Sequence, residues 1–177
     1  MLILVTGGAR SGKSSFALSL AGKYPKPWLF LATAEALDSE MARRIEAHKK
    51  ARPADWGLVE EPRRVVEALG AATKSAGVIV LDCITLWISN LLLSEEGFDE
   101  RNAAGRAEAL ADAVQGSACT VILVTNEVGS GVVPETEVGR KFRDCAGRAN
   151  QVLARRADEV FLMVSGISVK IKDGNHV

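Results

Sequence analysis

A glycine-rich segment near the start of the chain has the residue types and the spacing that bind nucleotide phosphates. Residues 7–14 read GGARSGKS and satisfy the pattern G-x-x-x-x-G-K-[ST]. Glycines let the backbone turn tightly enough for successive N–H groups to point at phosphate oxygens. Lys13 adds a positive charge for the β- and γ-phosphates, and the Ser14 hydroxyl can ligate Mg²⁺. The predicted phosphate-binding loop therefore comprises Gly7, Gly8, Ala9, Arg10, Ser11, Gly12, Lys13 and Ser14.

The sequence on either side is the context that such a loop requires. LILVT at residues 2–6 is an apolar run typical of a buried strand, and SSFALSLAG at residues 14–22 has a helical pattern. A helix that begins near Lys13 directs the positive end of its dipole at the same phosphates. The alternative, a glycine-rich turn with an unrelated lysine, explains neither the complete motif nor its flanks.

A metal-bound triphosphate also needs an acidic partner, and Asp82 ends the apolar run VIVLD at residues 78–82. The end of a buried strand is where P-loop proteins hold the carboxylate that binds Mg²⁺. The alternative role for Asp82 is that of a helix-capping or solvent-facing residue. Residues 125–128, TNEV, lack the Lys and Asp of the Asn-Lys-x-Asp motif with which regulatory GTPases read guanine. These motifs indicate a nucleoside triphosphate and Mg²⁺, and they leave the phosphate acceptor open.

His48 lies in a basic segment, RRIEAHKKARP at residues 43–53, with five Lys and Arg residues within positions 43–52. One interpretation is a solvated basic helix end, because cations favour helix C-termini. The other is a neutral imidazole nucleophile that attacks phosphorus while neighbouring cations stabilise the developing negative charge. The spacing alone does not choose between them. His176, in the tail of the chain, is assigned no role.

The chain pattern predicts the framework for these residues, an α/β fold with a mostly parallel sheet. Apolar runs occur at residues 2–6, 28–33, 78–82, 119–125 and 160–164. The first four are continuously apolar, as strands buried on both faces are, so we expect helices on both faces of the sheet. The alternating segment Ser168–Lys172 predicts an edge strand in a C-terminal hairpin. Helical patterns cover residues 35–51, 63–73, 99–114 and the segment from 138 to 153.

Length and composition restrict the class of protein. The 177 residues predict one domain, 1–177. The 22 Lys and Arg balance the 22 Asp and Glu, which disfavours a broad nucleic-acid-binding surface. The longest uncharged stretch, residues 113–126, is shorter than the ~18–20 residues of a membrane span, and the first residues lack the basic start of a signal peptide. The three widely spaced cysteines favour buried free thiols in a reducing cytoplasm: Cys83, Cys119 and Cys145.

Five longer segments carry a resemblance that covers nearly the whole chain. They are ILVTGGARSGKS (3–14), LATAEALDSEMARRIEAHKKARPADW (31–56), LVTNEVGSGVVPE (123–135), FRDCAGRANQ (142–151) and VSGISVKIK (164–172). Together they resemble the bifunctional adenosylcobinamide kinase / adenosylcobinamide-phosphate guanylyltransferase family of cobalamin synthesis. The combination of GGARSGKS, the single histidine in I-x-x-H-K and TNEVG is specific as a set. The resemblance implies a P-loop NTPase-like fold.

The resemblance also implies roles for individual residues. Residues 7–14 bind nucleotide phosphates with Lys13 as a catalytic residue, and His48 is the guanylylated residue. Asp82 belongs with Glu60 to the nucleotide site, although the family carries Glu where this chain has Asp82. The Asn126-Glu127 pair matches the family motif and is open to two interpretations, a binding loop at a strand end or a structural turn. The remaining residues at the nucleotide are Thr33, Ala34, Glu35, Lys49, Lys50, Ala51, Arg52 and Glu60.

Two reactions follow from the resemblance. In the first, ATP or GTP donates its γ-phosphate to adenosylcobinamide with Mg²⁺ present. In the second, His48 attacks the α-phosphate of GTP, and the GMP passes to adenosylcobinamide phosphate to give adenosylcobinamide-GDP. The resemblance further implies a homotrimer with active sites near subunit contacts. Two alternatives remain: a P-loop kinase for another small hydroxylated substrate, which would not need His48, and a regulatory nucleotide-binding module without chemistry.

Overall fold

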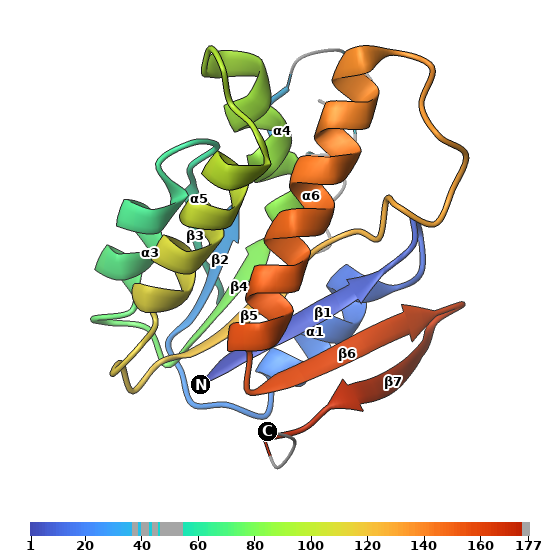
Figure 1. The fold of residues 1–177 in the computed structure, drawn as a ribbon. Helices are drawn as coiled ribbons and strands as arrows, with labels where there is room; N and C mark the ends of the chain where they lie inside the picture. Colours follow the sequence, from blue (N-terminus) through green and yellow to red (C-terminus); the bar gives the residue numbers. More distant parts are fainter. Residues whose placement is uncertain (37–38, 40–42, 44–45, 47–54, 175–177) are drawn as a thin grey trace.

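The computed structural model describes residues 1–36, 39, 43, 46 and 55–174. Within them, the strands form one sheet in the order β3-β2-β4-β5-β1-β6-β7 (Figure 1). All neighbours pair in parallel except β6 and β7, which form an antiparallel C-terminal hairpin. The predicted fold class is therefore confirmed. The strands are β1 (Leu2–Gly7), β2 (Trp28–Ala32), β3 (Gly57–Glu60), β4 (Val78–Asp82), β5 (Thr120–Val124), β6 (Glu159–Val164) and β7 (Ile167–Lys172).

Helices cover both faces of the sheet, as the apolar runs predicted. Successive residues of β1 belong to two different apolar clusters, Leu2 and Leu4 to one, Ile3 and Val5 to the other. Because neighbouring side chains of a strand point to opposite faces, both faces of β1 are buried. In Figure 1, α1 lies behind the sheet, and the other labelled helices lie in front of it. The helices are α1 (Lys13–Ala21), α3 (Val65–Ala72), α4 (Ile84–Ser94), α5 (Glu100–Asp112) and α6 (Glu137–Arg156).

The strand order decides which residues can meet. β5 lies between β1 and β4, with Val124 opposite Val5 on one side and Asp82 on the other. The segments that follow β1, β2, β3, β4 and β5 all leave the sheet at one edge, because these strands are parallel. Ligands of open α/β sheets bind at this edge.

Two elements were missed by the sequence patterns. β3 is a four-residue edge strand, GLVE, with mostly exposed side chains, so it lacks the apolar run of a buried strand. α4, ITLWISNLLLS, is apolar on most of its surface and shows little helical periodicity, because it is buried on several sides. The predicted helix at residues 35–51 lies largely outside the described residues.

The three cysteines are free and buried, as predicted. In the described part of the chain, no helix is long and apolar enough to cross a membrane.

Candidate nucleotide site

The loop between β1 and α1 folds around the ammonium group of Lys13. Its Nζ donates a hydrogen bond of 2.6 Å to the carbonyl of Gly8 and contacts Ser11 Oγ at 3.5 Å. Gly7, Arg10 and Gly12 have positive φ angles of 149°, 56° and 93°. A Cβ at Gly7 would lie 2.5 Å from the carbonyl oxygen of Met163, so only glycine fits there. The outer side of the loop, residues 8–10, is exposed.

Lys13 is a buried cation. Its side chain is only 7% exposed. Burial lowers the pKa of Lys13, and the nearby Cys83 and Asp82 offset this shift only in part. An ammonium group that water solvates poorly gains most from a bound anion. The loop thus presents a positive charge that a phosphate group would satisfy.

The backbone beside Asp82 is fixed by Thr33, which is fully buried. The Thr33 hydroxyl donates to the carbonyl of Cys83 at 2.7 Å and accepts from the N–H of Cys83 at 2.9 Å. The Thr33 N–H donates to the carbonyl of Asp82 at 3.2 Å. The side chain of Thr33 is therefore engaged in holding the end of β4, and the half-buried Asp82 carboxylate is presented from a rigid position.

Cys83 is not a second nucleophile of this site. Burial and the neighbouring Asp82 carboxylate raise the pKa of Cys83 to about 12. The group is therefore a thiol near neutral pH, and only the thiolate attacks phosphorus or carbon centres readily. Its sulfur accepts a hydrogen bond from the N–H of Leu86 and caps α4.

The segments that follow β2 and β3 are joined through α4. The Asn90 side chain donates to the carbonyls of Thr33 at 2.8 Å and Pro62 at 3.0 Å. Arg63 forms an ion pair with Glu35 at 3.0 Å, and its carbonyl accepts a hydrogen bond from the Trp87 indole. These contacts place residues 33–35 next to the segment that follows Glu60.

The predicted residues lie along one sheet edge, with Thr33 between Asp82 and Glu60. The phosphate loop, Asp82 and the Asn126-Glu127 segment follow the adjacent strands β1, β4 and β5. Glu60 is the last residue of β3, four strands from β1, which at about 4.8 Å per strand is roughly 19 Å from the phosphate loop. Thr33, Ala34 and Glu35 lie beside Glu60, because Ala32 is opposite Glu60 in the sheet. His48, Lys49, Lys50, Ala51 and Arg52 lie outside the described residues.

Several buried polar residues behind the site were not singled out from the sequence. Thr85 and Asn90 lie in α4, and Asn150 lies on the buried face of α6. Their signal in the sequence is a polar residue at an otherwise apolar position, such as the asparagine of ISNLLL. Buried polar groups of this kind are hydrogen-bonded in native proteins, and each of these is.

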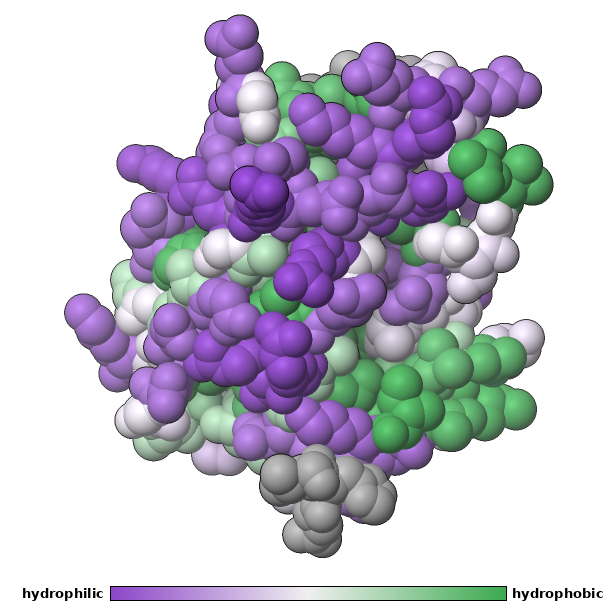
Figure 2. Space-filling view, viewed as in Figure 1, coloured by the Kyte–Doolittle hydropathy of each residue, from purple (hydrophilic) through white to green (hydrophobic). Residues whose placement is uncertain are grey.

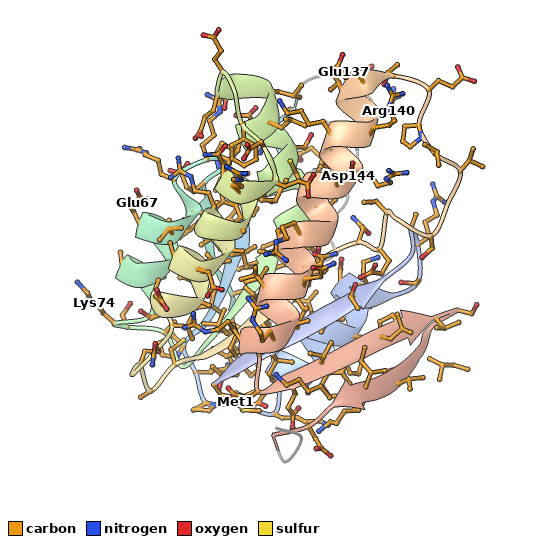
Figure 3. All side chains as sticks on the ribbon, in the orientation of Figure 1. Met1, Glu67, Lys74, Glu137, Arg140 and Asp144 are labelled. Carbon is orange, nitrogen blue, oxygen red and sulfur yellow. The ribbon has the colours of Figure 1, made fainter. Side chains whose placement is uncertain are left out.

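The segment between β5 and α6 borders the site on a third side. At its far end, Arg140 donates to the carbonyls of Pro134 at 3.1 Å and Glu135 at 2.6 Å. Figure 3 labels Glu137, Arg140 and Asp144 along the N-terminal half of α6, which rises beside this segment. At its near end, the segment is hydrogen-bonded to β1, because the N–H of Glu127 donates to the carbonyl of Gly7. Both ends of the segment are thus anchored.

Comparison with known proteins finds a matching family and relatives along nearly the whole chain. The model of the family "Cobinamide kinase / cobinamide phosphate guanyltransferase" matches residues 3–171. The bifunctional adenosylcobalamin biosynthesis protein CobU of Salmonella typhimurium is 47% identical, and that of Escherichia coli is 46% identical; each alignment covers 97% of this chain and 100% of the relative. The bifunctional adenosylcobalamin biosynthesis protein CobP of Pseudomonas aeruginosa is 40% identical over 96% of both chains.

A solved structure shows the same fold at low sequence identity. The flagellar accessory protein FlaH of Methanocaldococcus jannaschii superposes with a TM-score of 0.53 at 13% identity, covering 97% of this chain and 78% of FlaH. This likeness concerns the fold alone. The family match and the relatives confirm the predicted pair of transferase activities, a kinase acting on cobinamide and a guanylyltransferase acting on cobinamide phosphate. The chain belongs to the cobinamide kinase / cobinamide phosphate guanyltransferase family.

Proposed function

We propose that the phosphate loop carries the kinase reaction and that His48 carries the guanylyl transfer, with adenosylcobinamide and its phosphate as acceptors. The observation that carries the first assignment is the buried Lys13 ammonium inside a loop of glycines, close enough to Asp82 for their charges to interact. Phosphoryl transfer needs charge neutralisation and positioning more than covalent chemistry. Residues 7–14 supply both, through backbone N–H groups and one cation.

In the kinase step, the aminopropanol hydroxyl of adenosylcobinamide attacks the γ-phosphorus of ATP or GTP. The bond from the γ-phosphorus to the bridging oxygen breaks, the nucleoside diphosphate leaves, and the hydroxyl proton passes to solvent. Lys13 stabilises the negative charge on the phosphoryl oxygens as it redistributes. The N-terminus of α1, which begins at Lys13, adds its dipole to the same oxygens.

The residues present fit a Mg²⁺ ion. Mg²⁺ prefers hard oxygen ligands and keeps several waters, so it needs only one or two protein oxygens beside the phosphates. Ser14, in the first turn of α1, and Asp82, at the end of β4, offer a hydroxyl and a carboxylate. When bound, Mg²⁺ would neutralise charge on the β- and γ-phosphate oxygens.

In the guanylyl step, an imidazole nitrogen of His48 attacks the α-phosphorus of GTP and pyrophosphate leaves. A phosphate oxygen of adenosylcobinamide phosphate then attacks the same phosphorus, the P–N bond breaks, and adenosylcobinamide-GDP forms. We assign Lys49, Lys50, Ala51, Arg52 and the group of Thr33, Ala34, Glu35 and Glu60 to this nucleotide. The support from the described residues is that 33–35 and Glu60 share the sheet edge with the phosphate loop.

A two-stage assay tests the proposed function. The protein is incubated with adenosylcobinamide, ATP and Mg²⁺, and the corrinoid is analysed by mass spectrometry before and after GTP is added. We expect one added phosphate in the first stage and one added GMP in the second. Phosphorylation without guanylylation would support a plain P-loop kinase. Absence of both, with nucleotide still bound, would support a regulatory module.

Asp82→Asn is expected to lower the Mg²⁺-dependent kinase rate by more than tenfold. The substitution keeps the size of the side chain and removes the charge that would bind the metal, which is worth more than about 1.4 kcal/mol. The measurement is the rate as a function of Mg²⁺ concentration. Asp112→Asn, a matched change at an exposed position of α5, is the control. An unchanged Mg²⁺ titration and rate in Asp82→Asn would make Asp82 a strand-end residue without a metal role.

We also propose a homotrimer in the cytoplasm. The C-terminal hairpin exposes the apolar residues Val164, Ile167, Val169 and Ile171, and Figure 2 shows a hydrophobic patch over β6 and β7 that contrasts with the hydrophilic helices. Exposed patches of this kind are typical of protein–protein contacts. The nucleotide substrates and the three free thiols suit a reducing compartment. Sedimentation equilibrium measures the mass of the assembly directly.

A further inference from the structure

A network of polar side chains lies behind the phosphate loop and joins four elements of the fold. Its buried members are Thr6 in β1, Thr85 at the start of α4, Thr125 after β5 and Asn150 in α6, which are 5%, 5%, 0% and 8% exposed. Asn126 and Glu127, for which no role has been derived above, are its outer members. Burying such groups costs free energy unless each is hydrogen-bonded.

The hydrogen bonds of Asn150 have only one possible arrangement. A backbone carbonyl can only accept, so the amide nitrogen of Asn150 must be the group that faces the carbonyl of Asn126 at 3.1 Å. The amide oxygen then accepts from the hydroxyl of Thr125 at 2.7 Å. Because Thr125 donates its only hydroxyl proton to Asn150, the 3.1 Å contact between the two threonines is a donation from the Thr85 hydroxyl to Thr125 Oγ1. Thr85 in turn accepts from the N–H of Asn126 at 2.7 Å.

The network reaches the phosphate loop through Glu127. The second N–H of the Asn150 amide points to Glu127 Oε1 at 3.4 Å, and the same oxygen accepts from the hydroxyl of Thr6 at 2.8 Å. The backbone N–H of Glu127 donates to the carbonyl of Gly7 at 3.0 Å. Glu127 therefore holds the last two residues of β1, and the second of these, Gly7, is the first residue of the phosphate loop. Asn150 holds Glu127 from α6.

We propose that Asn150 is a positioning residue for nucleotide binding, which acts through Glu127 on the first residues of the phosphate loop. The geometry of the backbone N–H groups depends on how the chain leaves β1, and the side chains of Thr6 and Glu127 fix that exit. Asn150 uses its oxygen and both of its amide protons to keep Glu127 in place. The inference rests on the proposed phosphate-binding role of residues 7–14.

A double-mutant cycle on the full chain tests the proposal. The variants are Asn150→Ala, Glu127→Ala and the double variant, and the measurement is the Kd of a non-hydrolysable ATP analogue with Mg²⁺. We expect each single substitution to weaken binding about tenfold, and the double variant to bind no more than about twofold more weakly than the weaker single variant. Residues that act through one another show such non-additivity, whereas independent sites add.

Three controls separate positioning from a general loss of stability. Val152→Ala removes a fully packed side chain from the same helix without touching the network, so it should lower the melting temperature and leave the Kd unchanged. Glu127→Gln keeps an oxygen that accepts from Thr6 and Asn150, so it should restore most of the affinity lost in Glu127→Ala. Glu127 is exposed, so the Gln and Ala variants carry the test even if Asn150→Ala does not fold.

Three results would overturn the proposal. The first is that the losses of the two single variants multiply in the double variant. The second is that Val152→Ala weakens binding as much as Asn150→Ala does. The third is that Glu127→Gln is as damaging as Glu127→Ala. A parent protein that binds no triphosphate overturns the proposed role of the phosphate loop and this proposal with it. A parent that binds while the losses multiply overturns this proposal alone.

Discussion

Replacing His48 with asparagine is expected to abolish guanylyl transfer while the phosphorylation of adenosylcobinamide continues. Asparagine is polar and similar in size, but it cannot act as a nucleophile toward phosphorus, so no GMP–enzyme adduct can form. The γ-phosphate transfer uses no covalent histidine intermediate, because the hydroxyl of the acceptor attacks directly. The two halves of the reaction sequence should therefore separate in this one variant.

The measurement is covalent labelling with GTP that is radioactive in its α-phosphate. The parent should retain label after denaturation, and the label should be labile in acid and stable in base, as a phosphoramidate is. Peptide mapping should place it on His48. His176→Asn, which changes the other histidine of the chain, is the matched control and should label as the parent does. Label that survives in His48→Asn would overturn the assignment, and a joint loss of both activities would mean that His48 serves both steps.

The parts of the fold that the sequence predicted are those set by local pattern. Each buried strand is a short apolar run, and residues 7–14 form a motif whose turn geometry is dictated by its own glycines. The boundaries of the predicted strands differ from the observed ones by at most one residue, as in β2, which ends at Ala32 where the run ended at 33. β3 escaped prediction because an exposed edge strand needs no apolar run.

The parts of the site that could not be predicted depend on contacts between distant segments. Thr6, Thr85, Thr125 and Asn150 are far apart in the chain, and no motif pairs them with one another, although Thr125 begins TNEVG. Their meeting is fixed by the strand order, which places β5 between β1 and β4, and by the packing of α6 against β1 and α4. The same holds for Thr33, whose hydroxyl bonds the backbone of Cys83, while its place at the nucleotide stays a prediction. Periodicity predicts faces and elements, but it carries no information on side-chain partners.

Replacing Lys13 with alanine is expected to remove most of the phosphoryl transfer and leave the fold intact. Loss of one preorganised group that stabilises transition-state charge typically costs about 10²–10³-fold in rate. The fold should tolerate the change, because the pKa of Lys13 is lowered by burial: the folded protein binds this proton less tightly than the unfolded chain does. The protonated lysine therefore opposes folding at pH values below its lowered pKa, and this cost declines as the pH rises through that pKa.

The lowered pKa of Lys13 also determines how triphosphate affinity and stability change with pH. In the parent, triphosphate affinity should fall as the pH rises toward the pKa of Lys13, which lies below 10.5, since the phosphates need the protonated form. Over the same pH range, the stability of the parent should rise relative to that of Lys13→Ala. The triphosphate affinity of Lys13→Ala, which is weak throughout, should change little with pH. Thermal melts and analogue binding between neutral pH and pH 10 measure both trends. A folded Lys13→Ala protein with a near-parental kinase rate would show that the charge on Lys13 does not act on the transferred phosphate.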